Sequence, residues 1–214
     1  MESSSYWLLF LSAAIAINIT PGPDMIYILS RTITQGRKIG IASSLGVCSG
    51  SFVHIFAAAF GLSAIIATSA MAFGLVKYVG ATYLIYLGIQ ALRSKGISFD
   101  IPVKKQVQST FWKAFRQGAL IDILNPKVAI FFMAFLPQFV RPELGHVPAQ
   151  ILILGFLVNL IGVVVESILI LTAARTTNFF RNNSRFSTLL DRALGSMFIG
   201  LGIRLALIEG NHTN

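Results

Sequence analysis

The stretch Ile19-Thr20-Pro21-Gly22-Pro23-Asp24-Met25 decides how the chain folds, because it interrupts a long apolar segment that continues on both sides of it. A proline in a helix interior removes a backbone hydrogen bond and clashes with the preceding turn, at a cost of about 3 kcal/mol. Hydrocarbon holds no water that could bind the freed groups, so such a break is stable only where it faces protein or a wet cavity. The stretch therefore predicts a broken transmembrane helix.

A second break of the same kind lies at Asn125-Pro126-Lys127, inside the fourth apolar segment of the chain. Two interrupted helices at corresponding places in two halves of a chain are typical of transporters that bind substrate near the middle of the bilayer. The alternative is that both prolines are tolerated kinks. A matched pair of breaks argues against that alternative more strongly than a single break would.

The composition predicts an integral membrane protein. The chain has 214 residues, of which 55% are hydrophobic and 12% are charged, and its mean hydropathy is +0.74. A soluble domain carries about twice this share of charged residues. We expect one transmembrane domain over 1–214 with no soluble module. The first Arg or Lys is Arg31, which argues against a cleaved signal peptide and predicts that the first span is retained.

Turn and charge signals divide the chain into six predicted spans. These lie near 7–30, 40–67, 71–92, 115–140, 148–173 and 188–208. A polar stretch over 94–114, expected to be cytoplasmic, separates a first half (1–93) from a second half (115–214). Because each half holds three spans, an odd number, the second half must be inverted relative to the first. The predicted fold is an all-α membrane protein built from two inverted three-helix repeats, with helices 1 and 4 broken at the proline motifs.

Matched positions in the two halves support the repeat. They are Pro21 with Pro126, Gly50-x3-His54 with Gly162-x3-Glu166, and Leu87-Gly88 with Leu201-Gly202. One match alone is weak evidence, but three matches in the same order indicate a duplicated unit.

The net charge of +9 predicts an orientation rather than a nucleic-acid partner. Of the 17 Lys and Arg residues, 13 lie in or beside the loops after spans one, three and five, and four lie elsewhere. Cytoplasmic loops carry an excess of Lys and Arg. We therefore expect these three loops in the cytoplasm and both termini outside it.

Several chemistries are not indicated by the sequence. Cys48 is the single cysteine, which excludes an intramolecular disulfide, and His54, His146 and His212 have no metal-ligand spacing. No Walker, HExxH or GxSxG motif occurs. We therefore predict no enzyme activity, no metal site and no cofactor.

Four charged residues are expected at membrane depth: Asp24, Asp122, Lys127 and Glu166. A charged side chain there costs several kcal/mol, so a functional role with a partner in the interior is its first interpretation. Asp122 and Lys127 are five residues apart across the second break. Their alternative role is to neutralise each other.

The two breaks suit a substrate that carries both an anion and a cation. A half-helix that starts after Pro21-Gly22-Pro23 or at Pro126 presents unpaired backbone amides, which attract a carboxylate. Asp24 offers a counter-charge for an ammonium group. The predicted substrate-binding residues are Thr20, Pro21, Gly22, Pro23, Asp24, Asn125, Pro126 and Lys127. This set fits an amino acid better than a sugar or a lone ion.

Three ionisable residues are candidates for proton coupling: His54, Glu166 and Asp122. His54 is either a hydrogen-bonded packing residue or a proton-sensitive gate, since imidazole titrates near neutral pH. Glu166 shares one helical stripe with Gly155, Asn159 and Gly162. Glu166 is the better candidate for a proton carrier, because apolar surroundings disfavour the charged form of a carboxyl group.

The chain resembles the LysE/RhtB family of bacterial amino-acid exporters over nearly its full length. The resemblance is carried by Thr20-Pro21-Gly22-Pro23, by the Leu45-Gly46 to Gly50 glycines with His54, by the stretch from Lys77 to Gly88, by Asn125-Pro126-Lys127 with Phe131-Phe132, and by Leu136-Pro137-Gln138-Phe139. It implies an inner-membrane exporter with six spans that is driven by the proton gradient. Substrates across the family include basic amino acids and neutral ones such as homoserine, threonine and leucine.

The expected function is the export of small neutral or polar amino acids across the bacterial inner membrane, coupled to protons. The expected partners are the amino acid, protons and the lipid bilayer, with no nucleic acid, and a homo-oligomer is left open. The alternatives are an exporter of basic amino acids or of another small cation or metabolite, and a passive channel lined by the buried acids. An intramembrane enzyme would need a nucleophile–base pair or a metal cluster, and neither is visible in the sequence.

Overall fold

The computed structural model describes residues 4–62, 70–93, 109–182 and 184–207. Most of the predicted linker between the two halves lies outside these ranges. Helices make up the described part of the chain. They are α1 (Ser4–Ile19), α2 (Pro23–Gln35), α3 (Arg37–Phe56), the π-helix η1 (Ala57–Leu62), α5 (Ala70–Arg93), α6 (Phe111–Ile123), α7 (Pro126–Ile130), the π-helix η2 (Phe131–Phe135), the 3-10 helices η3 (Leu136–Phe139) and η4 (Pro142–Leu144), α8 (Val147–Asn182) and α9 (Ser184–Leu207). The all-α prediction is confirmed for these residues.

Both predicted breaks are present in the structure. The segments Tyr6–Ile19 and Pro23–Gln35 meet at a bend of 53°, and Phe111–Ile123 meets Pro126–Phe139 at a bend of 53° as well. The prolines take the first position of the helices that follow, where the missing N–H has no intrahelical partner in any case. Each predicted span with a proline motif is therefore a pair of shorter helices.

Length and composition support up to four membrane spans among the described residues. Arg37–Gly61 and Val147–Ala173 are long and apolar enough to cross a bilayer, and each of the two bent pairs passes the same criterion as one span. The helices α5 and α9 do not meet it over their described residues. Between two and four candidate spans are thus supported, and both the count of six and the inverted repeat stay predictions.

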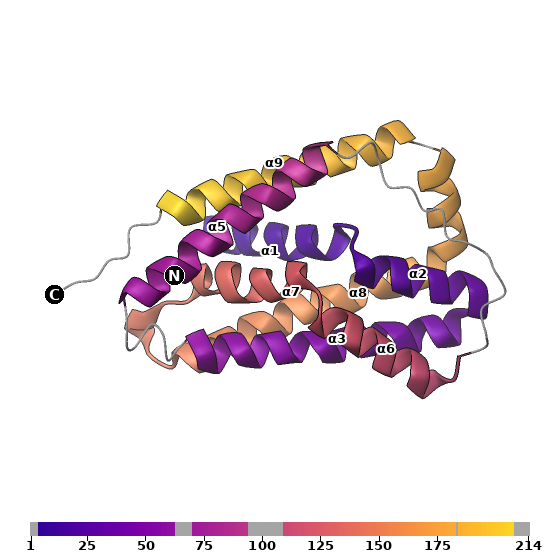
Figure 1. Ribbon diagram of the computed structural model, residues 1–214, viewed down its shortest axis with the longest axis horizontal. Helices are drawn as coiled ribbons and strands as arrows, with labels where there is room; N and C mark the ends of the chain where they lie inside the picture. The colour runs from indigo at the N-terminus through magenta and orange to yellow at the C-terminus, as the bar shows by residue number, and fades with distance from the viewer. Residues whose placement is uncertain (1–3, 63–69, 94–108, 183, 208–214) are drawn as a thin grey trace.

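The helices run lengthwise between two ends of the molecule. In Figure 1, α5 and α9 lie together on one side, α3 and α6 run along the other side, and α1, α2, α7 and α8 lie between these pairs. The helices α5 and α9 pack closely because glycines of each helix lie against the backbone of the other. A Cβ atom added to Gly88 would lie 2.6 Å from the carbonyl oxygen of Gly195, and one added to Gly202 would lie 2.8 Å from that of Ala81.

The long helix α8 has an apolar face and a more polar face. One of its faces carries exposed apolar side chains at helical spacing: Ile153, Phe156, Leu160, Val164, Ile168 and Leu171. The opposite stripe, predicted from the sequence, carries Gly155, Asn159, Gly162 and Glu166 and faces the interior. An apolar outside and a more polar inside reverse the pattern of a soluble protein, and this pattern identifies α8 as a membrane helix.

The predicted turn after the first span is also present. The helix α2 ends at Gln35, and Gly36 has a φ of 88°, which a residue with a Cβ atom rarely adopts. The N–H of Gly36 donates to the carbonyl oxygen of Thr32 and closes the end of α2. The chain then reverses directly into α3.

Candidate functional site

The first break places a glycine between two charged groups. Gly22 is extended and buried, and no side chain caps the first turn of α2. A Cβ atom at Gly22 would lie 2.8 Å from Nζ of Lys127 and would also contact the carboxylate of Asp24. The absence of a side chain at Gly22 therefore lets Lys127 approach the break. Thr20 turns its hydroxyl back to the carbonyl oxygen of Ala16 in the last turn of α1.

The second break is closed by its own asparagine. Asn125 is buried, and its Oδ1 accepts a hydrogen bond of 3.1 Å from the backbone N–H of Lys127, which caps the start of α7. Its Nδ2 lies 3.4 Å from Oδ1 of Asp24 on the other break. Asn125 thus connects the two interrupted helices. The sequence predicted free backbone amides at both breaks. In the structure a side chain caps the start of α7 but not the start of α2, so the two breaks differ in this respect.

Lys127 joins the two breaks through its ammonium group. Its Nζ lies 3.0 Å from the carbonyl oxygen of Thr20, 3.4 Å from that of Ile17 and 3.4 Å from each carboxylate oxygen of Asp24. The carbonyl end of a helix carries partial negative charge, and the amide end attracts an anion. The lysine therefore compensates the end of α1, and Asp24 compensates the start of α2.

Lys127 forms an ion pair with Asp24 and not with Asp122, which lies five residues before it in the sequence. The pairing with Asp122 considered above does not occur, and Nζ of Lys127 lies 3.4 Å from Oδ2 of Asp24 instead. The side chains are 7% and 15% exposed, so the pair is largely withdrawn from solvent. Breaking such a pair by removing one partner leaves an uncompensated buried charge.

A pocket lies between the two breaks and encloses about 410 Å³, including the part that opens outward. Its polar lining comes from Asn18, Asp24, Ser51, Asp122, Lys127, Asn159 and Glu166, and its apolar lining includes Ile17, Val47, Val128, Phe131, Phe132 and Val158. Small-molecule sites typically combine apolar walls with a few convergent polar groups. The arrangement can therefore hold a small molecule with both charged and apolar parts.

Two further carboxyl groups in the pocket are bound by donors from α3. Oδ2 of Asp122 accepts from the Ser51 hydroxyl at 2.9 Å. Oε2 of Glu166 accepts from the Ser44 hydroxyl at 2.5 Å and lies 3.6 Å from Sγ of Cys48. Neither carboxyl group has a cation within ion-pair distance among the described residues. A bound proton on either group would therefore neutralise a charge that the protein does not otherwise balance.

His54 lies outside this pocket. It is buried on α3, one turn beyond Ser51, and its Nε2 lies 3.0 Å from the backbone carbonyl oxygen of Asp122. The histidine thus contacts the backbone of a pocket residue and not its carboxyl group. Both interpretations of His54 given above fit this position.

A column of aromatic rings runs from the pocket toward the end of the molecule where α1 begins. Phe131, which lines the pocket, stacks on Phe135 with 4.9 Å between ring centroids, and Phe135 packs on Phe139 at 5.0 Å. Phe10 of α1 packs against Phe139 at 5.2 Å. The side chains of Phe10 and Phe135 have no exposed surface. The aromatic column therefore borders the pocket through Phe131.

The structure brings the predicted site residues together to different degrees. Asp24, Asp122, Lys127 and Glu166 line the pocket. The remaining predicted binding residues, Thr20, Pro21, Gly22, Pro23, Asn125 and Pro126, form the breaks beside it. The sequence interpretation missed Asn18, Ser44 and Ser51 as site residues. Their signal was present, because each is a polar residue inside an apolar run, and Ser44, Cys48 and Ser51 share one face of a helix by spacing.

The chain matches a known protein family and several bacterial membrane proteins. The LysE type translocator family matches residues 15–209. A protein of Vibrio cholerae named an uncharacterized membrane protein is 31% identical over 200 residues, which cover 94% of this chain and 96% of that protein. An uncharacterized membrane protein of Pseudomonas aeruginosa is 29% identical and covers 95% of each chain. The leucine efflux protein of Salmonella typhimurium is 28% identical and covers 96% of each chain. No solved structure matches the chain.

Proposed function

The chain belongs to the LysE family of translocators and is a membrane transporter rather than an enzyme, and from this premise we propose that it exports small neutral or polar amino acids such as leucine, threonine or homoserine. The observation that carries the proposal is the pocket, in which the Lys127–Asp24 pair stands beside walls of valine and phenylalanine. The pair matches the two charges of an amino acid, and the walls match an uncharged side chain. The leucine efflux relatives support the same substrate class.

The substrate takes the place of each partner in the ion pair. Its carboxylate binds Lys127 and the uncapped amides of α2, and its ammonium binds Asp24. The 3.4 Å separation of the pair supports this exchange, because a charge-assisted hydrogen bond is typically about 2.7–2.9 Å long. Lys127 and Asp24 therefore stabilise the empty site through a contact that is longer than optimal. Alternating access then arises as the two halves of the chain move about the occupied site.

Protons from the transmembrane gradient drive export through the carboxyl groups of the pocket. Asp122 and Glu166 are the leading carriers, because each faces the substrate site and lacks a cationic partner in the described residues. Asp24, Lys127 and Cys48 are the other ionisable groups that face them. His54 acts through its contact with the backbone of Asp122. The site is expected in the bacterial inner membrane.

Transport into proteoliposomes tests the substrate class. Labelled L-leucine, L-threonine, L-lysine, leucinamide and N-acetyl-leucine are compared under an imposed pH gradient. We expect transport of leucine or threonine, little transport of leucinamide and N-acetyl-leucine, and loss of transport in Asp24→Asn. The matched control is Glu143→Gln, which removes an exposed carboxylate far from the pocket in η4. Equal transport of leucine, its amide and its N-acetyl form would reject the zwitterion site.

An exporter of basic amino acids is the second candidate, and one observation favours it. Three carboxyl groups line the pocket, from Asp24, Asp122 and Glu166, against one lysine. If Asp122 or Glu166 were ionised, a cationic side chain would neutralise it. The proteoliposome assay with the five labelled compounds decides between the two candidate functions, because an exporter of basic amino acids should transport L-lysine faster than L-leucine.

Coupling is tested by comparing two fluxes in the same vesicles. Net efflux requires the empty carrier to return with its proton, whereas exchange at equal pH requires only alternating access with substrate bound. We expect Asp122→Asn and Glu166→Gln to weaken proton-driven efflux more than exchange, with His54→Gln giving a smaller difference. Equal loss of both fluxes would assign these residues to folding or substrate binding.

A further inference from the structure

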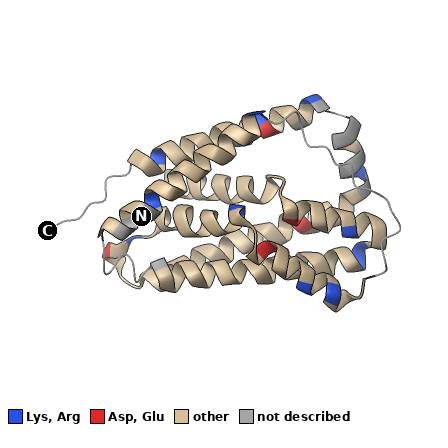
Figure 2. Cartoon of the chain, viewed as in Figure 1, with Lys and Arg blue, Asp and Glu red and all other residues tan. Residues whose placement is uncertain are grey.

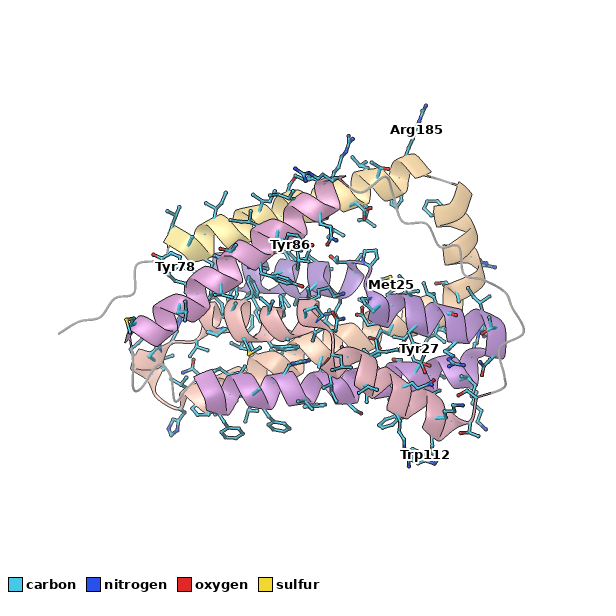
Figure 3. All side chains as sticks on the ribbon, viewed as in Figure 1. Met25, Tyr27, Tyr78, Tyr86, Trp112 and Arg185 are labelled. Atoms are coloured by element: carbon cyan, nitrogen blue, oxygen red, sulfur yellow. The ribbon has the colours of Figure 1, made fainter. Side chains whose placement is uncertain are left out.

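A polar contact joins α2 to α6 between the pocket and the basic end of the molecule. The hydroxyl of Tyr27 donates to the carbonyl oxygen of Ala114 at 2.9 Å and lies 3.2 Å from Oε1 of Gln117. Nη2 of Arg31 donates to the same Oε1 at 2.8 Å. Figure 3 shows Tyr27 between the two helices. We refer to the contact of Tyr27 and Arg31 with Ala114 and Gln117 as the α2–α6 seam.

The seam differs from the other contacts of α2. On its apolar face, Met25 and Leu29 pack with Ala173 of α8, and Ile28 packs with Val47 of α3. Separating those faces would expose buried apolar surface to water. The seam instead rests on hydrogen bonds donated by the Tyr27 hydroxyl and by the guanidinium of Arg31 to neutral acceptors on α6. It is therefore the side of α2 that can open at lowest cost.

Arg31 brings a positive charge to the seam without a negative partner. Its guanidinium lies 5.4 Å from the ring centroid of Tyr27, and no carboxylate lies within ion-pair distance in the parts of the chain that the structure describes. One donor atom of its five N–H groups has a protein acceptor there, the amide oxygen of Gln117. The remaining donors of the planar guanidinium suit a carboxylate, which it binds with two parallel hydrogen bonds.

The same face of α2 connects Arg31 to the pocket. Asp24, Tyr27 and Arg31 are spaced by three and then four residues, so they share one side of the helix. Seven residues correspond to about 10 Å along the axis, at 1.5 Å per residue. Asp24 lines the pocket near the start of α2, Arg31 is four residues before the last residue of α2, and Figure 2 shows cations gathered around that end of the helix. A molecule that passed along the seam would meet Arg31 before Asp24.

We propose that Arg31 is a docking site for the carboxylate of the substrate on its path between the basic end and the pocket. The carboxylate replaces the amide of Gln117 on the guanidinium, which removes one hydrogen bond of the seam and weakens the link between α2 and α6. The substrate then moves on to Asp24 and Lys127. This inference rests on the proposed export of amino acids and adds a second, transient binding position to it. The competing role for Arg31 is that of a loop cation that only orients the chain in the membrane.

Kinetics separate docking from a structural role. Transport of labelled L-leucine and its equilibrium binding to purified protein are measured for wild type, Arg31→Gln, Arg31→Lys and Arg116→Gln. Arg116 is the matched control, because it is an exposed arginine on α6 at the same end and outside the seam. We expect Arg31→Gln to lower the initial rate at low leucine about tenfold, with recovery at saturating leucine and less than a twofold change in equilibrium affinity. Arg31→Lys restores part of the rate, and Arg116→Gln resembles wild type.

A chemical readout tests docking without transport. Phenylglyoxal modifies accessible guanidinium groups, and mass spectrometry reports the extent of modification at each arginine. We expect tens of millimolar L-leucine to protect Arg31, leucinamide to protect it less, and neither to protect Arg116.

The outcomes distinguish this inference from the proposed function. Protection of Arg31 in a protein that does not transport leucine would support docking and count against the proposed substrate. Leucine transport with no protection and no effect of Arg31→Gln would overturn docking and leave the proposed function intact. A loss of equilibrium affinity as large as the loss of rate would also overturn docking, because Arg31 would then belong to the main site or to the fold.

Discussion

At the scale of single residues, Lys127 connects most of the candidate site. Its ammonium group contacts the last carbonyl oxygens of α1 and the carboxylate of Asp24, while its own backbone N–H is capped by Asn125. All of these groups come from the two interrupted helices. The breaks are therefore stabilised by each other as well as by their own turns.

The first prediction concerns the buried ion pair. We expect Lys127→Met to lower the free energy of unfolding by about 3–5 kcal/mol, because Asp24 and the end of α1 lose their cation. The double variant Lys127→Met with Asp24→Asn should be more stable than the sum of the single changes implies, since no charge is left unpaired. Denaturation of purified protein in mixed micelles measures the cycle. Strictly additive effects would show that the two side chains do not interact.

The sequence predicted which charged residues lie at the breaks and in the interior better than it predicted their partners. Charged residues inside apolar segments identified Asp24, Asp122, Lys127 and Glu166, and all four line the pocket. Spacing along the chain, however, offered Asp122 as the neighbour of Lys127. The true partner lies on α2, and a contact between residues about one hundred positions apart is set by packing that local patterns do not encode.

At the scale of helices, the two breaks are built differently. Gly22 leaves the first turn of α2 without a side-chain cap, whereas Asn125 caps α7 and also reaches Asp24. A cap that contacts the opposite break can transmit a change at one interrupted helix to the other. An ordinary cap elsewhere in the chain lacks that second contact.

The second prediction compares two caps. Thr110 caps α6 at the surface by accepting from the N–H of Lys113 at 3.3 Å. Loss of either cap should cost about 1 kcal/mol. We expect Asn125→Ala to abolish export in addition, while Thr110→Ala exports normally. Parallel measurements of unfolding and of leucine efflux test this, and wild-type efflux from Asn125→Ala would remove that residue from the site.

The third prediction concerns the close packing of α3 on α6. A Cβ atom at Gly50 would lie 2.6 Å from the carbonyl oxygen of Ala119, and one at Gly118 would contact the backbone of Ser43. We expect Gly50→Ala and Gly118→Ala to destabilise the protein by about 1–3 kcal/mol through overpacking. The control is Gly200→Ala on α9, which meets no atom within 4 Å and should be neutral or slightly stabilising. Denaturation midpoints of the three variants give the comparison.

Helix existence was predictable, and helix ends were less so. The apolar segments and the Gln35-Gly36 turn gave the course of the chain. The helix α8 nevertheless continues past 173 to Asn182, and α6 begins at Phe111 rather than near 115. A helix satisfies its own backbone hydrogen bonds, so it can extend beyond the apolar segment without cost from lipid. The π-helix η2 had no recognisable signal in the sequence, whereas Pro137 indicates a departure from the α-helix at the 3-10 helix η3, because a proline removes an intrahelical hydrogen bond.

At the scale of the whole molecule, the charges divide the protein into two ends. Figure 2 shows lysines and arginines gathered where α2 ends and α3 and α6 begin, with few cations at the opposite end, where α1 begins and α9 ends. The uneven distribution of Lys and Arg among the loops, inferred from the sequence, therefore corresponds to an uneven distribution between the two ends of the structure. Trp112 points away from the bundle at the basic end in Figure 3 and is 65% exposed, as suits a side chain at a membrane interface.

The fourth prediction is the orientation of the chain. Because cations favour the cytoplasmic side, we expect the basic end in the cytoplasm and both termini outside it. A reporter fused after Asn214 should behave as periplasmic, and one inserted near residue 100 as cytoplasmic. The result is valid only if the full-length fusion protein still exports its substrate. Cytoplasmic activity of the C-terminal reporter would overturn the topology.

The global arrangement was predictable in class but not in detail. Composition predicted a membrane protein made of helices, and the described residues agree. The count of six spans depends on α5 and α9, which pack against each other and are not among the candidate spans found in the described residues.

The aromatic column has a consequence for the electrical state of the membrane. Water between Phe10, Phe131, Phe135 and Phe139 would find few hydrogen-bond partners, and narrow apolar constrictions empty of water and block ions. We therefore expect the column to hinder the passage of ions in this conformation, although Phe131 lines the same pocket as Asp122 and Glu166. Each proton that leaked through would dissipate about 2.3 kcal/mol per 100 mV of membrane voltage. A carrier sealed in this way can reside in an energised membrane between transport cycles without discharging it.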